Sequence, residues 1–228
     1  MKKGPLTLSC FLAFMLFAVA TPPAIAEPSP DTLSPLRSRL LDGETVIHLF
    51  RNDDDVIDVS GSIYIRSTPE RIWSYITDYN NLASTMPRVK KSRLVEENGN
   101  LKIVDQTSKT GVLFIKIKFN TRSAIIESFP DTLSFDLISG DFKTFSGQWI
   151  LTPDENRNGT FLSWSAVVKP DFPAPGFIID AVQKRDLKEL LETIRELSET
   201  GMSSPSRKNL PDPAASLPQK LEEHPQVM

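Results

Sequence analysis

The sequence predicts an α+β domain in which one curved antiparallel sheet of about six to seven strands wraps around a single long C-terminal helix. Two observations lead to this fold class. Between residues 57 and 168, apolar and polar residues alternate over successive short stretches that are separated by turn signals, which is typical of half-buried antiparallel strands. After residue 175 the apolar residues recur at helical spacing instead. Because each predicted strand has one apolar face, we expect the sheet to bury that face against the helix.

The first 26 residues have the three-part pattern of a secretory signal peptide. Two lysines precede the apolar run Leu6–Ala20, and Ala24-Ile25-Ala26 follows a proline pair. The run is shorter than the roughly 20 residues that span a bilayer. We therefore predict cleavage after Ala26 and a periplasmic or secreted protein, with an uncleaved membrane anchor as the alternative.

Composition excludes several classes of function. The formal net charge is −3 and becomes more negative when Lys2 and Lys3 leave with the signal, which argues against nucleic-acid binding. The only cysteine, Cys10, also lies in the signal, so no disulfide or thiolate nucleophile is expected. His48 and His224 both fall outside the predicted domain. With no glycine-rich phosphate loop either, we expect no catalytic residue of these common types, no metal site and no cofactor.

Residues 27–55 are predicted to be a linker and a poorly defined N-terminal segment. Pro28, Pro30 and Pro35 stand among serines and threonines in its first part, which indicates a linker. The stretch 37–50 is compatible with either a short helix or a strand. The acidic triplet Asp53–Asp55 lacks the spaced oxygen ligands of a calcium loop, so a solvated turn is expected.

The predicted domain covers residues 56–200 and begins with a strand and a short helix. Ile57–Arg66 alternates as a strand, and Ser67-Thr68-Pro69-Glu70 has a hydroxyl cap, an early proline and an acid, which together predict a helix start. Strands then follow one another, beginning with a hairpin at Asn98-Gly99. In the long strand Val112–Ser128 the alternation places Ile117 inside. Phe135, Trp149 and Trp164 fall on the inner faces of later strands.

The long helix is predicted over Phe177–Leu197, between Pro175 and Gly201. Its apolar stripe consists of Ile179, Leu187, Leu190, Ile194 and Leu197. Gln183 interrupts this stripe, and the pattern leaves two interpretations open: the amide reaches water at the edge of the stripe, or it faces an internal cavity. Residues 201–228 are rich in proline, serine and charge without periodicity and are predicted to be a disordered tail.

Three stretches resemble the START-like (SRPBCC) superfamily, and most closely its coenzyme Q-binding START domain branch, which is grouped with the polyketide cyclase/dehydrase family. They are the strand and helix GSIYIRSTPERIWSYITDYNNLASTMPRVKKSRLV, the segment FSGQWIL at Phe145–Leu151, and the proline-led final helix. The resemblance covers about residues 56–200. It implies the helix-grip fold, with a deep hydrophobic pocket for a lipid-like or aromatic molecule. The secretion signal separates this chain from the ribosome-associated and mitochondrial quinone-binding members.

The favoured hypothesis is an exported binding protein that holds a small hydrophobic ligand, a lipid or a quinone-like molecule, between sheet and helix. The residues predicted to line the pocket are Ile63, Ile117, Phe135, Trp149, Trp164, Ile179 and Gln183. Ordinary core packing is the alternative for the tryptophans. Lys116, Lys118 and Arg122 are expected on a solvated outer face, with transient contact to anionic lipid headgroups as the alternative.

Two other functions remain open at this point. A cyclase or dehydratase would need pocket carboxylates, and Asp105, Asp180 and Asp186 fall on or near inward faces, with a solvated position at a strand end or helix edge as the alternative for each. A protein-interaction module with a collapsed cavity would instead use its surface or its tail to hold a partner, whose identity the sequence leaves unknown.

Overall fold

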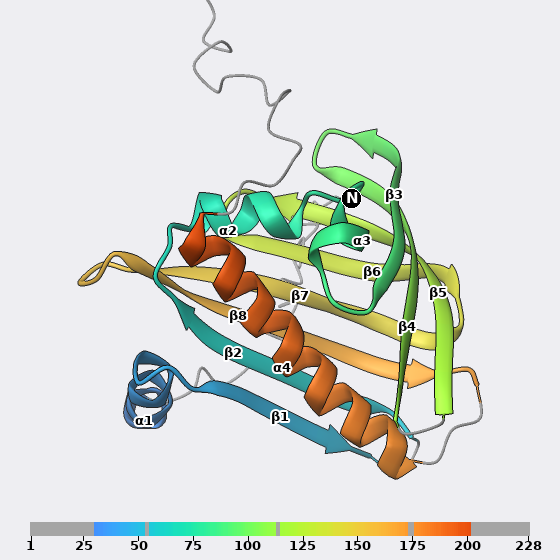
Figure 1. Cartoon of the computed structure of the whole chain (residues 1–228), viewed down its shortest axis with the longest axis horizontal. Helices are drawn as coiled ribbons and strands as arrows, with labels where there is room; N and C mark the ends of the chain where they lie inside the picture. The colour runs from blue at the N-terminus through green and yellow to red at the C-terminus, as the bar shows by residue number, and fades with distance from the viewer. Residues whose placement is uncertain (1–29, 53–54, 113–114, 173–175, 202–228) are drawn as a thin grey trace, which may run out of the picture.

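The computed structural model describes residues 30–52, 55–112, 115–172 and 176–201. The predicted signal peptide, all but Gly201 of the predicted tail, and residues 53–54 of the acidic triplet lie outside these ranges. Across the described ranges, eight strands form one antiparallel sheet in the order β1-β2-β8-β7-β6-β5-β4-β3, and helix α4 crosses one face of it (Figure 1). The predicted fold class, a helix-grip α+β domain, is confirmed.

The strands are β1 (Thr45–Arg51), β2 (Ile57–Ile65), β3 (Val89–Asn98), β4 (Leu101–Val112), β5 (Ile115–Ser128), β6 (Thr132–Gly140), β7 (Phe142–Asp154) and β8 (Gly159–Pro170). The helices are α1 (Pro30–Leu41), α2 (Pro69–Ile76), α3 (Leu82–Thr85) and α4 (Gly176–Thr200). After β3, each strand pairs with the next one in the chain, whereas β2 pairs with β8, so the sheet is a meander whose last strand returns beside its second.

Helix α4 runs diagonally over the sheet, from the ends of β1 and β4 to α2 (Figure 1). Gly201 follows it with a φ of 74°, a left-handed conformation that suits the residue after a helix. Leu187 and Ile194 of the predicted stripe are buried, but the stripe omits Leu191, which is also fully buried. The apolar face is therefore broader than the predicted single row, as expected where a helix sits in a concave sheet.

The linker predicted for the first part of residues 27–55 is a helix from Pro30 on, and the stretch 37–50, left open between helix and strand, contains both. Helix α1 and strand β1 form there, and β1 pairs with β2 along its whole length, which adds an eighth strand to the predicted six to seven. Leu40, Val46 and Tyr64 form a small core of their own between α1 and the sheet. The turn signals of the prolines were misleading because Pro35 lies inside α1, where tertiary packing outweighs helix propensity.

The main core includes buried residues of β2, β8, α2 and α4, and α4 rests on β1 and β2 at one side of it. Gly61 of β2 makes this close approach possible, since a Cβ there would lie 2.7–2.9 Å from the side chains of Ile47, Leu187 and Leu191. Ile63, two residues further along β2, is fully buried in the same core. Farther from this contact, over β4 to β7, helix and sheet diverge and leave the space described next.

Candidate functional site

A cavity of about 300 Å³ lies between α4 and the inner face of the sheet. Strands β4 to β8 form its floor, α4 contributes Gln183, Asp186, Leu187, Leu190 and Ile194, and the segment from Ile76 to Val89 covers one side. Its inner end is tightly closed, because Ile76, Leu82 and Leu133 are all buried. At the other end, Phe119, Phe142 and Phe172 are only half-buried. The cavity therefore opens toward the end of the sheet where β4 meets β5.

Aromatic rings make up the wall on β6, β7 and β8. Phe135 stacks on Trp164 with ring centres 6.1 Å apart, and Trp149 meets Trp164 edge-on at 6.2 Å. Phe145 connects Phe135 to Phe142 at 5.0 and 5.4 Å. Because these rings pack on one another, they form a continuous and rigid apolar surface that suits a flat or chain-like apolar molecule.

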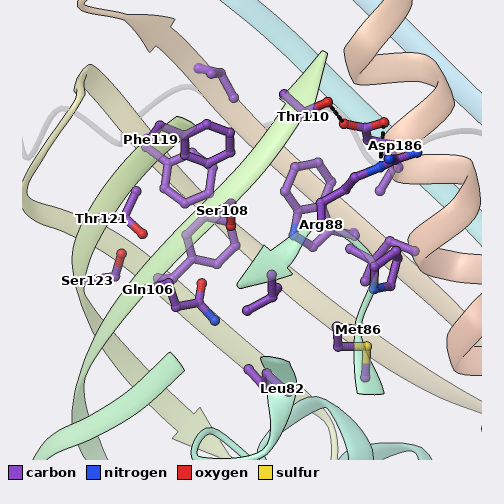
Figure 2. A pocket seen from close by; sticks show the side chains of 18 of the residues that line it. Leu82, Met86, Arg88, Gln106, Ser108, Thr110, Phe119, Thr121, Ser123 and Asp186 are labelled. Carbon is purple, nitrogen blue, oxygen red and sulfur yellow. Dashed lines mark hydrogen bonds and ion pairs between the residues drawn. The ribbon is translucent and has the colours of Figure 1, made fainter. Parts of the chain in front are cut away.

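The wall on β4 and β5 carries polar side chains beside apolar ones such as Ile117 and Phe119. Gln106, Ser108 and Thr110 alternate along β4, and Thr121 and Ser123 lie on the inner side of β5 (Figure 2). Among the described residues, no hydrogen-bond partner is found for the hydroxyls of Ser108, Thr121 and Ser123. Their donors and acceptors therefore remain available to polar atoms of a molecule that lies against the aromatic wall.

A charged cluster joins three elements at the open end of the cavity. Arg88, just before β3, approaches Asp186 of α4 with Nε 3.3 Å from Oδ1 (Figure 2). Arg88 also pairs with Glu189 of α4. Thr110 of β4 donates a hydrogen bond to Asp186, and Arg185 binds the same carboxylate at 2.6 Å. Both carboxylate oxygens of Asp186 are therefore engaged, which fixes α4 against β3 and β4.

Tyr79 lies at the inner end of the cavity and donates a hydrogen bond of 2.5 Å to Glu127. Burial and then this bond to Glu127 raise the pKa of Tyr79 far above its ordinary value. The phenol therefore keeps its proton at any physiological pH and acts as a donor, not as a base.

The structure places five of the seven predicted pocket residues in the cavity wall: Ile117, Phe135, Trp149, Trp164 and Gln183. For Gln183, the cavity-facing alternative is the one observed. Ile63 is not in the wall, because α4 rests directly on β2 and the leucines of the helix fill the space above it. The side chain of Ile179 lies outside the described part of the chain.

Of the three candidate carboxylates, only Asp186 lines the cavity. Asp105 lies on the outer face, where Arg122 binds it at 2.6 and 2.8 Å, and Asp180 pairs with Arg51 at 2.5 Å. For Asp105 the solvated alternative is the one observed, and the physical reason lies in β4. Apart from Val104, the cavity-lining positions of β4 are polar, so the hydrophobic alternation does not identify the inner face of this strand.

Sequence reasoning missed the polar wall, Arg88 and the Tyr79–Glu127 pair. The regular spacing of Gln106, Ser108 and Thr110 in β4 was a usable signal, because three uncharged polar residues at every second position fit a wetted inner face as well as an outer one. Arg88 and Glu127 carry no such signal, since only the fold brings them to Asp186 and Tyr79.

Within the described ranges, no cluster of three or more His, Cys, Asp or Glu side chains could hold a metal ion. In the same part of the chain, no helix is both long and apolar enough to cross a membrane.

Comparison with known proteins gives one family and a set of similar folds. The family described as polyketide cyclase/dehydrase and lipid transport matches residues 65–195, which is more than half of the chain. No curated protein matches in sequence.

Three solved structures illustrate the similarity of fold. A START superfamily protein from Mycobacterium smegmatis has 16% identity and a TM-score of 0.53, with 63% of this chain and 97% of that chain covered. The Zhui aromatase/cyclase from Streptomyces sp. R1128 has 13% identity and a TM-score of 0.55, covering 66% and 98%. A STAR-related lipid transfer protein from Xanthomonas axonopodis has 13% identity and a TM-score of 0.51, covering 67% and 98%.

Proposed function

Because the chain belongs to the polyketide cyclase/dehydrase and lipid transport family, we propose that it binds a small hydrophobic molecule in the cavity between α4 and the sheet. The observation that carries the proposal is the pairing of an aromatic wall with a wall of unpaired hydroxyls around a space of about 300 Å³. A collapsed interaction module would have no such space.

The chemistry of the two walls favours a compact, quinone-like ligand over a two-chain lipid. A volume of about 300 Å³ lies at the small end of ligand pockets, which suits one ring system or one short chain. The apolar body would gain about 25 cal/mol for each Å² that it buries against the rings. Ring oxygens would accept hydrogen bonds from Ser108, Thr121 and Ser123 and thereby set the orientation of the ligand.

The first test is native mass spectrometry of the protein purified gently from its own source, followed by denaturing analysis of whatever is released. The expected result is one stoichiometric hydrophobic molecule. A protein that carries nothing, and that takes up neither short-chain quinones nor single-chain lipids, would contradict the proposal.

Tryptophan fluorescence provides a second test with an internal control. Two of the three tryptophans, Trp149 and Trp164, line the cavity, whereas Trp73 packs on Phe129 and does not. A short-chain quinone should quench the wild type and Trp73→Phe strongly. It should quench the double variant Trp149→Phe/Trp164→Phe only weakly. Equal quenching of both variants would place the quinone elsewhere.

We also infer export, from the signal-peptide pattern of residues 1–26. Cell fractionation and N-terminal sequencing test it, with a mature protein that begins at Glu27 as the expected result. An intact N-terminus in the cytosolic fraction would contradict it.

A cyclase or dehydratase remains a second candidate function because Asp186 lies in the cavity wall. Both of its oxygens are already bound by Thr110 and by arginines, so a proton-transfer role would require this cluster to open. Asp186→Asn would abolish conversion of a substrate but leave its binding within a few fold. If no molecule found in the cavity is ever converted by the wild type, the enzymatic role is excluded for that ligand.

A further inference from the structure

The outer side of the β4–β5 hairpin carries an unusual concentration of positive charge for an acidic protein. Lys109 of β4 and Lys116 and Lys118 of β5 are exposed and point away from the cavity. Among the described residues, none of the three has an ion-pair partner. We call these three residues the hairpin lysines.

Two of the hairpin lysines stand directly opposite each other. Lys109 and Lys118 are cross-strand partners, and Lys116 is the next outward residue along β5. Like charges in directly opposed positions destabilise a sheet. Farther along the same face, Asp105 forms ion pairs with Arg122 and Arg93. Basic residues of this face therefore do have an acidic partner at that position. The hairpin lysines have no such acidic partner among the described residues, so their charge is available to a partner outside the chain.

The position of these lysines indicates what that partner is. Residues alternate on a strand, so the inward neighbours Thr110 and Ile117 of the same hairpin line the cavity near its open end. A flat anionic surface that bound the hairpin lysines would therefore lie beside the entrance. Nucleic acid fits poorly, because the chain as a whole carries a formal net charge of −3.

We propose that the hairpin lysines form a docking surface for anionic lipid bilayers, which brings the cavity entrance alongside the membrane. The contact is electrostatic and peripheral, since each basic residue near an anionic surface strengthens binding by about fivefold and the attraction fades beyond a Debye length. Delivery of a ligand to the bilayer rests on the proposed binding function, whereas the docking itself does not.

The test is co-sedimentation of the mature protein with vesicles. Vesicles of phosphatidylcholine plus phosphatidylglycerol should bind the protein at low salt, and vesicles of phosphatidylcholine alone should not. The triple variant Lys109→Gln/Lys116→Gln/Lys118→Gln should lose about a hundredfold in partitioning, from about fivefold per lysine. Its thermal stability should stay the same or rise, because the repulsion between Lys109 and Lys118 is removed.

The matched control is Arg39→Gln/Arg157→Gln/Lys188→Gln, which removes the same charge from three exposed positions on α1, the β7–β8 turn and α4. It should partition within about twofold to threefold of the wild type, since these residues lie away from the hairpin. Equal losses in both variants, no binding to anionic vesicles at low salt, or a soluble protein that binds the hairpin lysines in place of vesicles would each overturn the proposal. Quinone quenching of Trp149 and Trp164 should be unchanged in the triple variant, which separates failure of docking from failure of ligand binding.

Discussion

Individual glycines decide how closely the layers of this protein approach. At Gly61, an added Cβ would meet three side-chain ends from β1 and α4 at 2.7–2.9 Å. At Gly147 of β7, it would meet the backbone oxygen of Ser165 at 2.0 Å and the ring of Phe135 at 2.8 Å. Side chains can shift by a few tenths of an ångström, whereas a paired strand cannot.

We expect Gly61→Ala to lower the free energy of unfolding by about 1–3 kcal/mol, the usual range for overpacking a core. Gly147→Ala should cost more, because it forces β7 away from β8. Urea unfolding of both variants measures the difference. A Gly61→Ala protein as stable as the wild type would show that α4 can move off the sheet at no cost.

Asp154 connects the end of β7 to α1. Burial raises its pKa, but the N–H of Asn156 and the guanidinium groups of Arg37, 2.9 Å away, and Arg157 outweigh this effect and lower the pKa below its ordinary value. The unfolded chain therefore binds this proton at higher pH than the folded protein does. The stabilisation is complete above about pH 4, the ordinary range for aspartate, and is lost as the pH falls through the lower folded-state value.

Asp154→Asn should thus be less stable than the wild type at neutral pH, and its stability should fall less steeply in acid. Urea midpoints across the acidic range check this. The control is Asp105→Asn, which breaks a more exposed pair with Arg122. Its effect should be smaller and should shrink further in high salt. Identical acid profiles for Asp154→Asn and the wild type would contradict the assignment.

At the scale of elements, the apolar face of α4 both packs on the sheet and lines the cavity. Leu191 is fully buried against the sheet beside Gly61, whereas the neighbouring Leu190 lines the cavity. These two residues are adjacent in the sequence, so a step of one residue around the helix leads from the surface packed on the sheet to the cavity wall.

Truncation of these two leucines should separate stability from binding. Leu191→Ala should cost about 2–5 kcal/mol, because it opens a void in a closed core. Leu190→Ala should cost less, because it only enlarges a space that already exists, but it should change quinone quenching several fold. Thermal unfolding and fluorescence titration of both variants measure the two effects. Equal losses of stability would show that the cavity is closed around Leu190 in solution.

At the scale of the whole molecule, the contacts that hold α4 to the sheet differ from one end to the other. Leu187, Leu191 and Ile194 pack on the sheet from the middle of the helix toward α2. Near the β4–β5 end the contacts are polar, through Arg88, Thr110 and Asp186. Partly exposed polar contacts open more readily than buried apolar ones, so we expect ligands to enter at the charged end.

Arg88→Gln should therefore speed both uptake and release of a quinone by several fold, with a small change in affinity, because it weakens the closed state without touching the aromatic wall. Stopped-flow fluorescence measures both rates. The control is Lys188→Gln, which removes a positive charge that pairs with Glu192 within α4 and should have a smaller effect. Unchanged rates in Arg88→Gln would mean that the ligand enters elsewhere.

The sequence by itself determined the fold class and much of one cavity wall. Phe135, Trp149 and Trp164 were predicted to face inward because their strands alternate cleanly, and α4 was placed within a few residues by its proline and glycine signals. These are local properties, since the period of side-chain burial is written into each element.

The tertiary structure alone decided which inward positions border a space and which are packed shut. Ile63 and Trp164 both lie on inner faces, yet α4 covers the first and leaves the second open, because the helix crosses the sheet diagonally. The polar wall of β4, the meeting of Arg88 with Asp186 and the docking of α1 depend on the same long-range geometry. Periodicity states which face a residue is on, but the distance between two faces is set only when the layers come together.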